Sequence, residues 1–231
     1  MRILVILFSL MATVSFAQDS WLIDKNGCKV YNPYPRKHES VEWTGECKDG
    51  TANGYGKLIW YLKGKKTNNV YTGFMKNGRP EGKGKYETQT KFFKETFEGV
   101  FQNGELSFGT IYSYSKQDTT KYVGEITNWK ANGHGVMSFS DGDWFKGEFK
   151  DNYFIDGVYT VPSLGYKIES SEWKYYSTPK GTLTWGDGSV YIGELEVYLP
   201  HGNGMIVYPD GVIQKGKWRN GILIKILESD L

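Results

Sequence analysis

Residues 191–208 read YIGELEVYLPHGNGMIVY, and the rest of the chain repeats this pattern. Tyr191 stands two places before Gly193, and nine residues after that glycine a Gly-x-Gly step begins at Gly202. Four segments keep this spacing: Trp43, Gly45, Gly54 and Gly56; Tyr71, Gly73, Gly82 and Gly84; Tyr122, Gly124, Gly133 and Gly135; and Tyr191, Gly193, Gly202 and Gly204. Four copies at one spacing indicate an internal repeat.

The glycine that follows the aromatic residue serves as the reference position of each unit. Aligned on it, residues 41–221 divide into eight units, with a spacing that settles near 23 residues. The eight reference positions are Gly45, Gly73, Gly99, Gly124, Gly147, Ser171, Gly193 and Gly216. In the unit of Ser171, Glu169 replaces the aromatic residue, and a bend or a wider loop is expected there.

Residue types around the reference glycine alternate with a period of two. The residue two places after it is apolar in every unit, and the residue two places before it is aromatic in six. The residue directly after it is Glu in five units, whereas Phe74, Val100 and Lys217 stand there in the others. This alternation predicts a strand with the aromatic residue and the glycine on its buried face and Glu on its solvated face.

Turn residues separate these strands. Lys76-Asn77-Gly78, Gln102-Asn103-Gly104 and Asn132-Gly133 are predicted to join the two strands of a unit. Asp141-Gly142, Asp187-Gly188 and Asp210-Gly211 are predicted to join one unit to the next. Asn-Gly and Asp-Gly tolerate the positive φ angles of tight hairpins, so the chain is predicted to be an all-β, antiparallel meander.

Glycine on a buried face needs a large group over it, because a strand otherwise avoids glycine. The aromatic rings of the next strand are the predicted cover. Since 29 of 231 residues are Gly and 16% are aromatic, the core is expected to consist of rings stacked over glycines. Each unit then depends on its neighbours, as in other repeat proteins.

The two ends of the chain do not fit the repeat. Residues 1–17 contain Arg2, an apolar run and the small residues Ser15 and Ala17 at the two positions that a signal peptidase reads, which predicts a cleaved signal peptide. The mature protein is therefore expected to be secreted or periplasmic. Residues 18–40 and 222–231 are interpreted as N-terminal and C-terminal caps over the open edges of the sheet.

Cys28 and Cys47 are the two cysteines of the chain. In an oxidising compartment an even number of cysteines usually pairs, so a disulfide is the favoured interpretation, and two small buried apolar residues are the alternative. Closing a loop of this size is worth about 3 kcal/mol. The net charge of +2 gives no footprint for a nucleic acid.

The segments YIGELEVYLPHGNGMIVYPDG and YVGEITNWKANGHGVMSFSDG resemble the MORN (membrane occupation and recognition nexus) repeat family. The resemblance covers about residues 41–221 and is weaker in the units of Gly99, Gly147 and Ser171. It implies an elongated, twisted antiparallel sheet that serves as a scaffold joining proteins, or proteins and membranes. Phospholipid binding, which is ascribed to some members of the family, is one of the implied functions.

Groups that carry chemistry are sparse. His134 and His201 lie in equivalent turns of different units, so an extended sheet keeps them apart, and neither a metal nor a cofactor is expected. Asp141 with Asp143, and Glu194 with Glu196, share a strand face, but a catalytic pair would need one desolvated carboxyl group. Catalysis is therefore not expected, and the protein is predicted not to be an enzyme.

Aromatic residues are the remaining binding candidates. Rings on the glycine face are core in one interpretation and an open aromatic surface in the other, with Trp60, Trp185, Tyr198 and Tyr208 as its centre. The favoured function is an exported scaffold that binds a protein. The alternatives are a glycan-binding module that uses this aromatic face and peripheral attachment to phospholipid.

Overall fold

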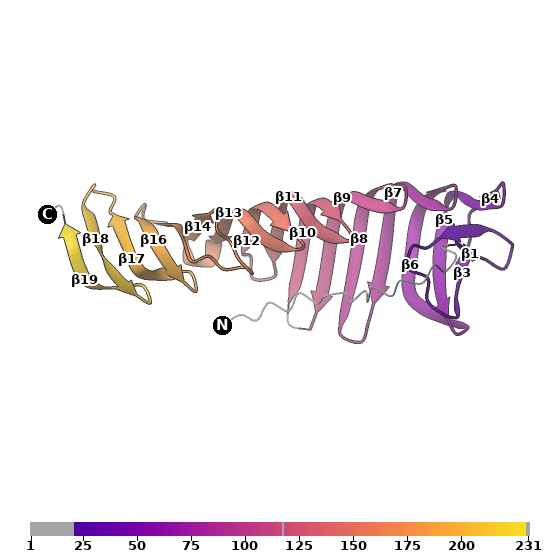
Figure 1. Cartoon of the computed structure of the whole chain (residues 1–231), viewed down its shortest axis with the longest axis horizontal. Helices are drawn as coiled ribbons and strands as arrows, with labels where there is room; N and C mark the ends of the chain where they lie inside the picture. Colours follow the sequence, from indigo (N-terminus) through magenta and orange to yellow (C-terminus); the bar gives the residue numbers. More distant parts are fainter. Residues whose placement is uncertain (1–20, 117, 230–231) are drawn as a thin grey trace.

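The computed structural model describes residues 21–116 and 118–229, whose strands form one long, mostly antiparallel sheet that does not close (Figure 1). The predicted all-β meander is thereby confirmed. The predicted signal peptide lies outside the described residues. The part of the chain that the structure describes contains no helix with the length and apolarity needed to span a bilayer.

From β5 to β19 the strands follow one another in chain order along the long axis of the molecule, and β1 to β4 lie at the N-terminal end beside β5 and β6 (Figure 1). They are β1 (Trp21–Ile23), β2 (Lys29–Tyr31), β3 (Glu39–Trp43), β4 (Glu46–Lys48), β5 (Thr51–Leu62), β6 (Lys65–Lys76), β7 (Arg79–Gln89), β8 (Phe93–Gln102), β9 (Glu105–Ser115) and β10 (Thr119–Thr127). They continue with β11 (Lys130–Phe139), β12 (Trp144–Lys150), β13 (Tyr153–Val161), the short 3-10 helix η1 (Pro162–Leu164), β14 (Tyr166–Ser170), β15 (Lys180–Trp185), β16 (Val190–Glu196), β17 (Leu199–Val207), β18 (Ile213–Arg219) and β19 (Ile222–Ser229).

A two-residue turn joins the two strands of each unit, and both residues of this turn have positive φ. We call this turn the tip of the unit. Among the described residues these pairs are Asp49–Gly50, Asn77–Gly78, Asn103–Gly104, Asn128–Trp129, Asp151–Asn152, Tyr175–Tyr176, Val197–Tyr198 and Asn220–Gly221. Two consecutive positive φ angles are the geometry of type I′ hairpin turns. The prediction of a turn at Asn132-Gly133 is wrong, because both residues lie inside β11 and the tip of that unit is Asn128–Trp129.

Gly133 instead marks a bend, and Gly82 and Gly202 mark the same bend in other units. All three have positive φ inside a strand, at 71°, 68° and 58°. Opposite each of them the register of the preceding strand shifts by a bulge, for example between Gly124 and Ile126. A bulge bends its strand, so glycine serves here to turn the end of the hairpin.

Neighbouring tips are joined through the backbone. Gly78 N–H donates to the Ala52 carbonyl oxygen, Gly104 N–H to that of Pro80 and Gly221 N–H to that of Pro200, each at 2.9 Å. In each case the acceptor lies two residues beyond the second tip residue of the unit before. The bends therefore place successive tips side by side along one edge of the sheet.

In four units the ring that covers the glycine pair comes from the same unit, which corrects the expectation that it would come from the next strand. Tyr71 lies along its own strand, so that a Cβ built on Gly73 or on its partner Gly84 would lie 2.7 Å from the Tyr71 ring. Tyr122 covers Gly124 and Gly135 in the same way, and Tyr191 covers Gly193 and Gly204. The side chain two places before a glycine points to the same face, which lets the ring lie flat over it.

Adjacent units meet through ring-to-ring contacts. The residue two places after the reference glycine packs edge-on against the aromatic residue of the unit before it. The pairs are Tyr71–Phe101, Tyr122–Phe149 and Tyr191–Trp218, with ring centroids 5.2, 4.9 and 5.3 Å apart. Edge-to-face geometry at this distance adds about 0.5–1.5 kcal/mol to the burial of each ring. The core is thus continuous from unit to unit although the sheet is single.

The N-terminal segment packs beside the first two units. Lys29 N–H donates to the Gly50 carbonyl oxygen at 2.9 Å, and Tyr31 N–H donates to that of Gly78 at 2.8 Å. An Asp24 carboxylate oxygen accepts the Trp43 N–H at 3.4 Å, at the free edge of β3. This segment therefore covers tips as well as part of an edge.

The C-terminal segment is one more strand. β19 pairs with β18 and covers its edge, but in the described chain β19 has no strand on its other side and is itself an open edge. In the unit of Ser171, β14 ends at Ser170. The buried hydroxyl group of Ser170 makes hydrogen bonds with Thr178 and Lys180. The irregular residues 171–179 form the wider loop expected there.

Candidate functional site

The residue directly after the reference glycine has a structural role in two units. Glu125 accepts the backbone N–H of His134 at 2.9 Å, and Glu194 accepts that of Asn203 at 3.0 Å. Each acceptor lies opposite the bend, where the register shift leaves a backbone N–H to be satisfied. The bond from the Asn203 backbone is the main cause that holds the pKa of Glu194 below its usual value.

Apolar side chains replace this Glu in the second and third units. Phe74 and Val100 occupy the equivalent position and are 52% and 47% exposed. Tyr55 lies directly opposite Phe74 on β5, with ring centroids 5.3 Å apart, and Phe108 lies directly opposite Val100 on β9. Tyr55 and Phe108 are 62% and 54% exposed.

These four residues form what we call the outer apolar row: Tyr55, Phe74, Val100 and Phe108. The row runs across β5, β6, β8 and β9 on the face opposite the covered glycines. On β7, Lys83 pairs directly with Val100, so a lysine interrupts the row between Phe74 and Val100. Beyond Phe108 the next residue across the sheet is Glu125. The outer apolar row thus ends at the fourth unit, in which Glu again follows the reference glycine.

The sequence contained the signal for this row, since Phe74 and Val100 break the Glu pattern. The presence of Phe74 and Val100 where other units have Glu marks this position in the sequence. Only the strand register shows that Tyr55 and Phe108 lie beside them. The predicted Glu face is therefore solvated in part of the sheet and apolar in another part.

The aromatic residues proposed from the sequence lie elsewhere, at the margin of the core. Trp60, Trp185, Tyr198 and Tyr208 are each half-buried and pack against buried residues of the glycine face. Tyr198 stacks on Tyr159, and its hydroxyl group donates to the carbonyl oxygen of Tyr176. That these four residues bind a ligand stays a prediction.

Cys28 and Cys47 form a disulfide with their Cα atoms 5.7 Å apart, as the sequence indicated. The bond ties the loop between β1 and β2 to β4, since Cys28 precedes β2 and Cys47 lies within β4. Cys28 is fully buried. The disulfide thus fastens the N-terminal segment to the first repeat unit.

Candidate acid, base and metal groups do not converge. His201 Nδ1 lies 2.8 Å from a carboxylate oxygen of Glu196, with His201 half-buried and Glu196 exposed. Asp143 is buried and accepts the Tyr159 hydroxyl group at 2.7 Å, while Asp141 accepts the Asp143 backbone N–H at 3.0 Å. Within residues 21–116 and 118–229, His, Cys, Asp and Glu form no group of three that could hold a metal ion.

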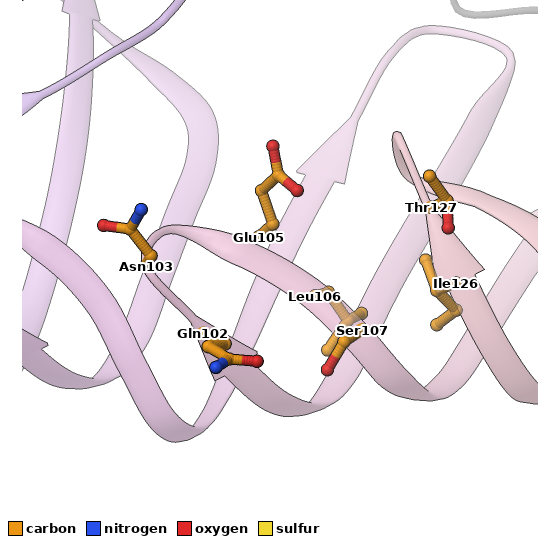
Figure 2. Close-up of a pocket in the computed structure, with 7 residues that line it drawn as sticks. All are labelled: Gln102, Asn103, Glu105, Leu106, Ser107, Ile126 and Thr127. Atoms are coloured by element: carbon orange, nitrogen blue, oxygen red, sulfur yellow. The ribbon is translucent and has the colours of Figure 1, made fainter.

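A shallow hollow lies between the third and fourth units, where the hairpin of β8 and β9 faces the end of β10 (Figure 2). Its lining side chains are Gln102, Asn103, Glu105, Leu106, Ser107, Ile126 and Thr127. Glu105 is the single carboxyl group among them, and the lining contains no His or Cys. The hollow therefore lacks the paired groups that acid–base or nucleophilic catalysis requires.

Comparison with known families identifies the repeat. The MORN repeat family matches residues 43–61, 71–90, 122–144, 180–190 and 191–213. Four of these segments begin with the tryptophan or tyrosine that covers a glycine pair: Trp43, Tyr71, Tyr122 and Tyr191. A search of curated proteins found no match to this chain.

Proposed function

Because the chain is a MORN repeat protein, we propose that it is an exported, non-enzymatic scaffold that binds another protein through the outer apolar row. One observation carries the proposal. At the position where Glu125 and Glu194 accept a backbone N–H, Phe74 and Val100 give up that bond and expose apolar surface. A protein partner would cover this surface and offset the loss.

The chemistry of the row suits a protein interface. Aromatic residues are enriched at the centres of such interfaces, where they fill pockets of the partner. The Tyr55 and Phe74 rings already contact each other edge-on at 5.3 Å, which holds both in place before binding. Preorganised side chains lose less conformational entropy when a partner binds.

Export rests on two supports, the predicted signal peptide at residues 1–17 and the disulfide between Cys28 and Cys47. Disulfides persist in oxidising compartments and are rare in reducing ones. The test is to express the full chain and determine the N-terminus of the product by mass spectrometry. Cleavage before Gln18 is expected, and an intact Met1 in the purified protein would contradict export through this leader.

Site-specific photo-crosslinking tests the protein-binding surface. A benzoyl-phenylalanine placed at Phe74 in the cells that make the protein is expected to capture a protein adduct, identified by mass spectrometry. Ile192 is the matched control, because it is 42% exposed on the same face of the seventh unit. Equal yields at the two positions would contradict binding through the row. Polysaccharide binding that is lost in Trp60→Ala would instead favour the glycan alternative on the glycine face, and vesicle binding by the unchanged protein would favour the phospholipid alternative.

A further inference from the structure

We propose that the protein binds an acidic polysaccharide along one edge of its sheet, through the loops that follow β5 and β7 and the turn that precedes β3. Six lysines carry the charge of these segments, and all six are exposed. They are Lys37, Lys63, Lys65, Lys66, Lys91 and Lys94, and we call them the basic edge. This surface and this ligand are independent of the outer apolar row and of its protein partner.

The fold brings these lysines to one side of the sheet. Lys63 and Lys65 flank the turn between β5 and β6, and Lys91 lies in the loop between β7 and β8, at the strand ends opposite the tips (Figure 1). The Lys63 N–H donates to the His38 carbonyl oxygen at 2.9 Å, which places the turn that contains Lys37 beside it. Neighbouring strands lie about 4.8 Å apart, so the two loops follow each other at about 10 Å along the edge.

Positive charge is concentrated at this edge. Residues 36–39, 62–66 and 89–94 contain seven Lys and Arg against one Asp or Glu, a net charge of +6. The tips at the other ends of these strands, residues 48–51, 76–79 and 102–105, contain three against two, a net charge of +1. The whole chain carries only +2. The excess therefore belongs to the edge, where it raises the local concentration of anionic ligands.

Acidic side chains near the basic edge already have cationic partners. Glu39 contacts Arg36 at 2.8 Å, and Glu42 contacts Lys25 at 2.6 Å. Glu87 lies 3.1 Å from Lys85 and 3.7 Å from Lys94. Within residues 21–116 and 118–229, the other five lysines of the basic edge make no ion pair. Their charge is therefore available to a ligand.

Exposed aromatic rings lie beside the lysines. Phe92 is 65% exposed, and Tyr114, which pairs directly with Lys94 on the neighbouring strand, is 41% exposed. Thr90 Oγ1 accepts the backbone N–H groups of Phe92 and Phe93, both at 3.2 Å, so the loop has a fixed backbone that leaves the Phe92 ring in solvent. The electron-rich face of such a ring attracts the C–H groups of a sugar.

An acidic polysaccharide suits this edge better than other anionic ligands. Its carboxylate or sulfate groups recur along an extended chain and can meet successive loops, and flexible lysines need no fixed geometry to contact them. Phe92 is the one exposed apolar side chain of residues 62–66 and 89–94. These loops therefore offer little apolar surface to a bilayer, and no succession of rings on which the bases of a nucleic acid would stack.

Three dextrans that share a backbone and differ in charge test the proposal: dextran sulfate, carboxymethyl-dextran and unmodified dextran. Binding to the purified protein is measured by isothermal titration calorimetry at several salt concentrations. The two acidic polymers are expected to bind, with an affinity that falls as salt rises, whereas the neutral polymer is expected not to bind. Comparison of the two acidic polymers shows whether sulfate or carboxylate is preferred. Failure of both to bind would overturn the proposal.

Lys65→Gln/Lys66→Gln/Lys91→Gln removes three charges from the basic edge. It is expected to weaken the binding of acidic dextran at least about ten-fold and to make the salt dependence shallower, because fewer counterions are released. Phe92→Ser is expected to weaken binding without a change in the salt dependence, since it removes a ring and no charge. Melting temperatures of the variants are measured so that misfolding is recognised.

The matched control is Lys146→Gln/Lys150→Gln/Lys217→Gln, which removes three exposed lysines elsewhere on the sheet and is expected to bind as the unchanged protein does. Equal weakening in the two triple variants would overturn the proposal, because any lysines would then serve. Oligothymidylate or phosphatidylglycerol vesicles that bind as tightly through the same lysines would also overturn it in favour of a nucleic acid or a membrane. Capture of a protein at Phe74 does not involve these lysines, so either proposal can fail while the other stands.

Discussion

The Tyr191 hydroxyl group donates to the carbonyl oxygen of Glu194, three residues along its own strand, at 2.8 Å. The same hydroxyl lies 3.1 Å from the His201 carbonyl oxygen. Tyr71 and Tyr122 repeat the first bond with Phe74 and Glu125 at 2.8 and 2.7 Å. A tyrosine thus covers its glycine pair with the ring and satisfies the backbone at the bulge with the hydroxyl.

Tyr191→Phe keeps the ring and removes this bond. Because the carbonyl oxygens would lose their donor in a buried site, we expect a loss of about 1–2 kcal/mol in the free energy of unfolding, measured by urea titration. Burial raises the pKa of Tyr191 to about 12, which agrees with a hydroxyl group held away from water. Tyr34→Phe, at a 60% exposed ring, is the control and should change stability little. Equal effects of the two would contradict a structural role for the bond.

Gly84→Ala places a methyl group against the Tyr71 ring. The added Cβ would lie 2.7 Å from a ring carbon, closer than packed carbon atoms allow. We expect a loss of about 1–3 kcal/mol, because overpacking forces the ring or the backbone to move. Lys85→Ala, one residue further and on the other face, is the matched control. Thermal unfolding followed by circular dichroism measures both, and a stable Gly84→Ala would show that the ring does not lie over this glycine in solution.

Glu194→Ala removes the acceptor of the Asn203 N–H and is expected to lower the melting temperature at pH 7. The folded state lowers the pKa of Glu194, so its contribution is present above the unfolded pKa, near 4.5, and is lost as pH falls through the folded pKa. The difference between Glu194→Ala and the unchanged protein should therefore shrink in acid. A difference that stays constant from pH 7 to pH 3 would exclude the carboxylate as its source.

Reduction of the Cys28–Cys47 bond is expected to lower the free energy of unfolding by about 3 kcal/mol, because the bond closes a loop in the unfolded chain. Melting temperature with and without dithiothreitol measures the effect. Cys28→Ala/Cys47→Ala should melt at one temperature in both conditions. If reductant lowered the melting temperature of that variant too, the effect would not come from the disulfide.

The sequence predicted the strands and their faces well, because period two and glycine spacing depend on local geometry. Tyr71, Phe97, Tyr122, Phe145 and Tyr191 are all buried as expected. The spacing of residues does not show which aromatic ring covers which glycine, since the strand that contains the glycine and its neighbouring strand each contain an aromatic residue. That choice depends on the side-chain direction along the strand.

Several tips could not be predicted, because their residues rarely adopt positive φ. Trp129, at φ 63°, stands where Asn or Gly would be expected. Its ring packs edge-on against Phe97 at 5.2 Å and lies 5.2 Å from Tyr86, two residues of earlier units. Packing of this large ring offsets an unfavourable backbone conformation. Such a long-range contact cannot be predicted from the residue types of the turn alone.

Half of the outer apolar row could be identified from the sequence. Phe74 and Val100 stood out as departures from Glu, whereas Tyr55 and Phe108 acquire meaning only through strand pairing. The exposed edge of β19 was likewise not predicted, since an apolar terminal segment was expected to close the sheet.

The strands of this sheet cross its long axis, and from β5 to β19 each strand pairs with the strands next to it in the chain (Figure 1). A pulling force applied between the two ends of the molecule would therefore break the hydrogen bonds between strands a few at a time, at one hairpin after another. Such a protein would extend gradually under tension and refold as the tension falls. The disulfide of Cys28 and Cys47 would keep residues 28–47 closed in a loop while the units beyond it open.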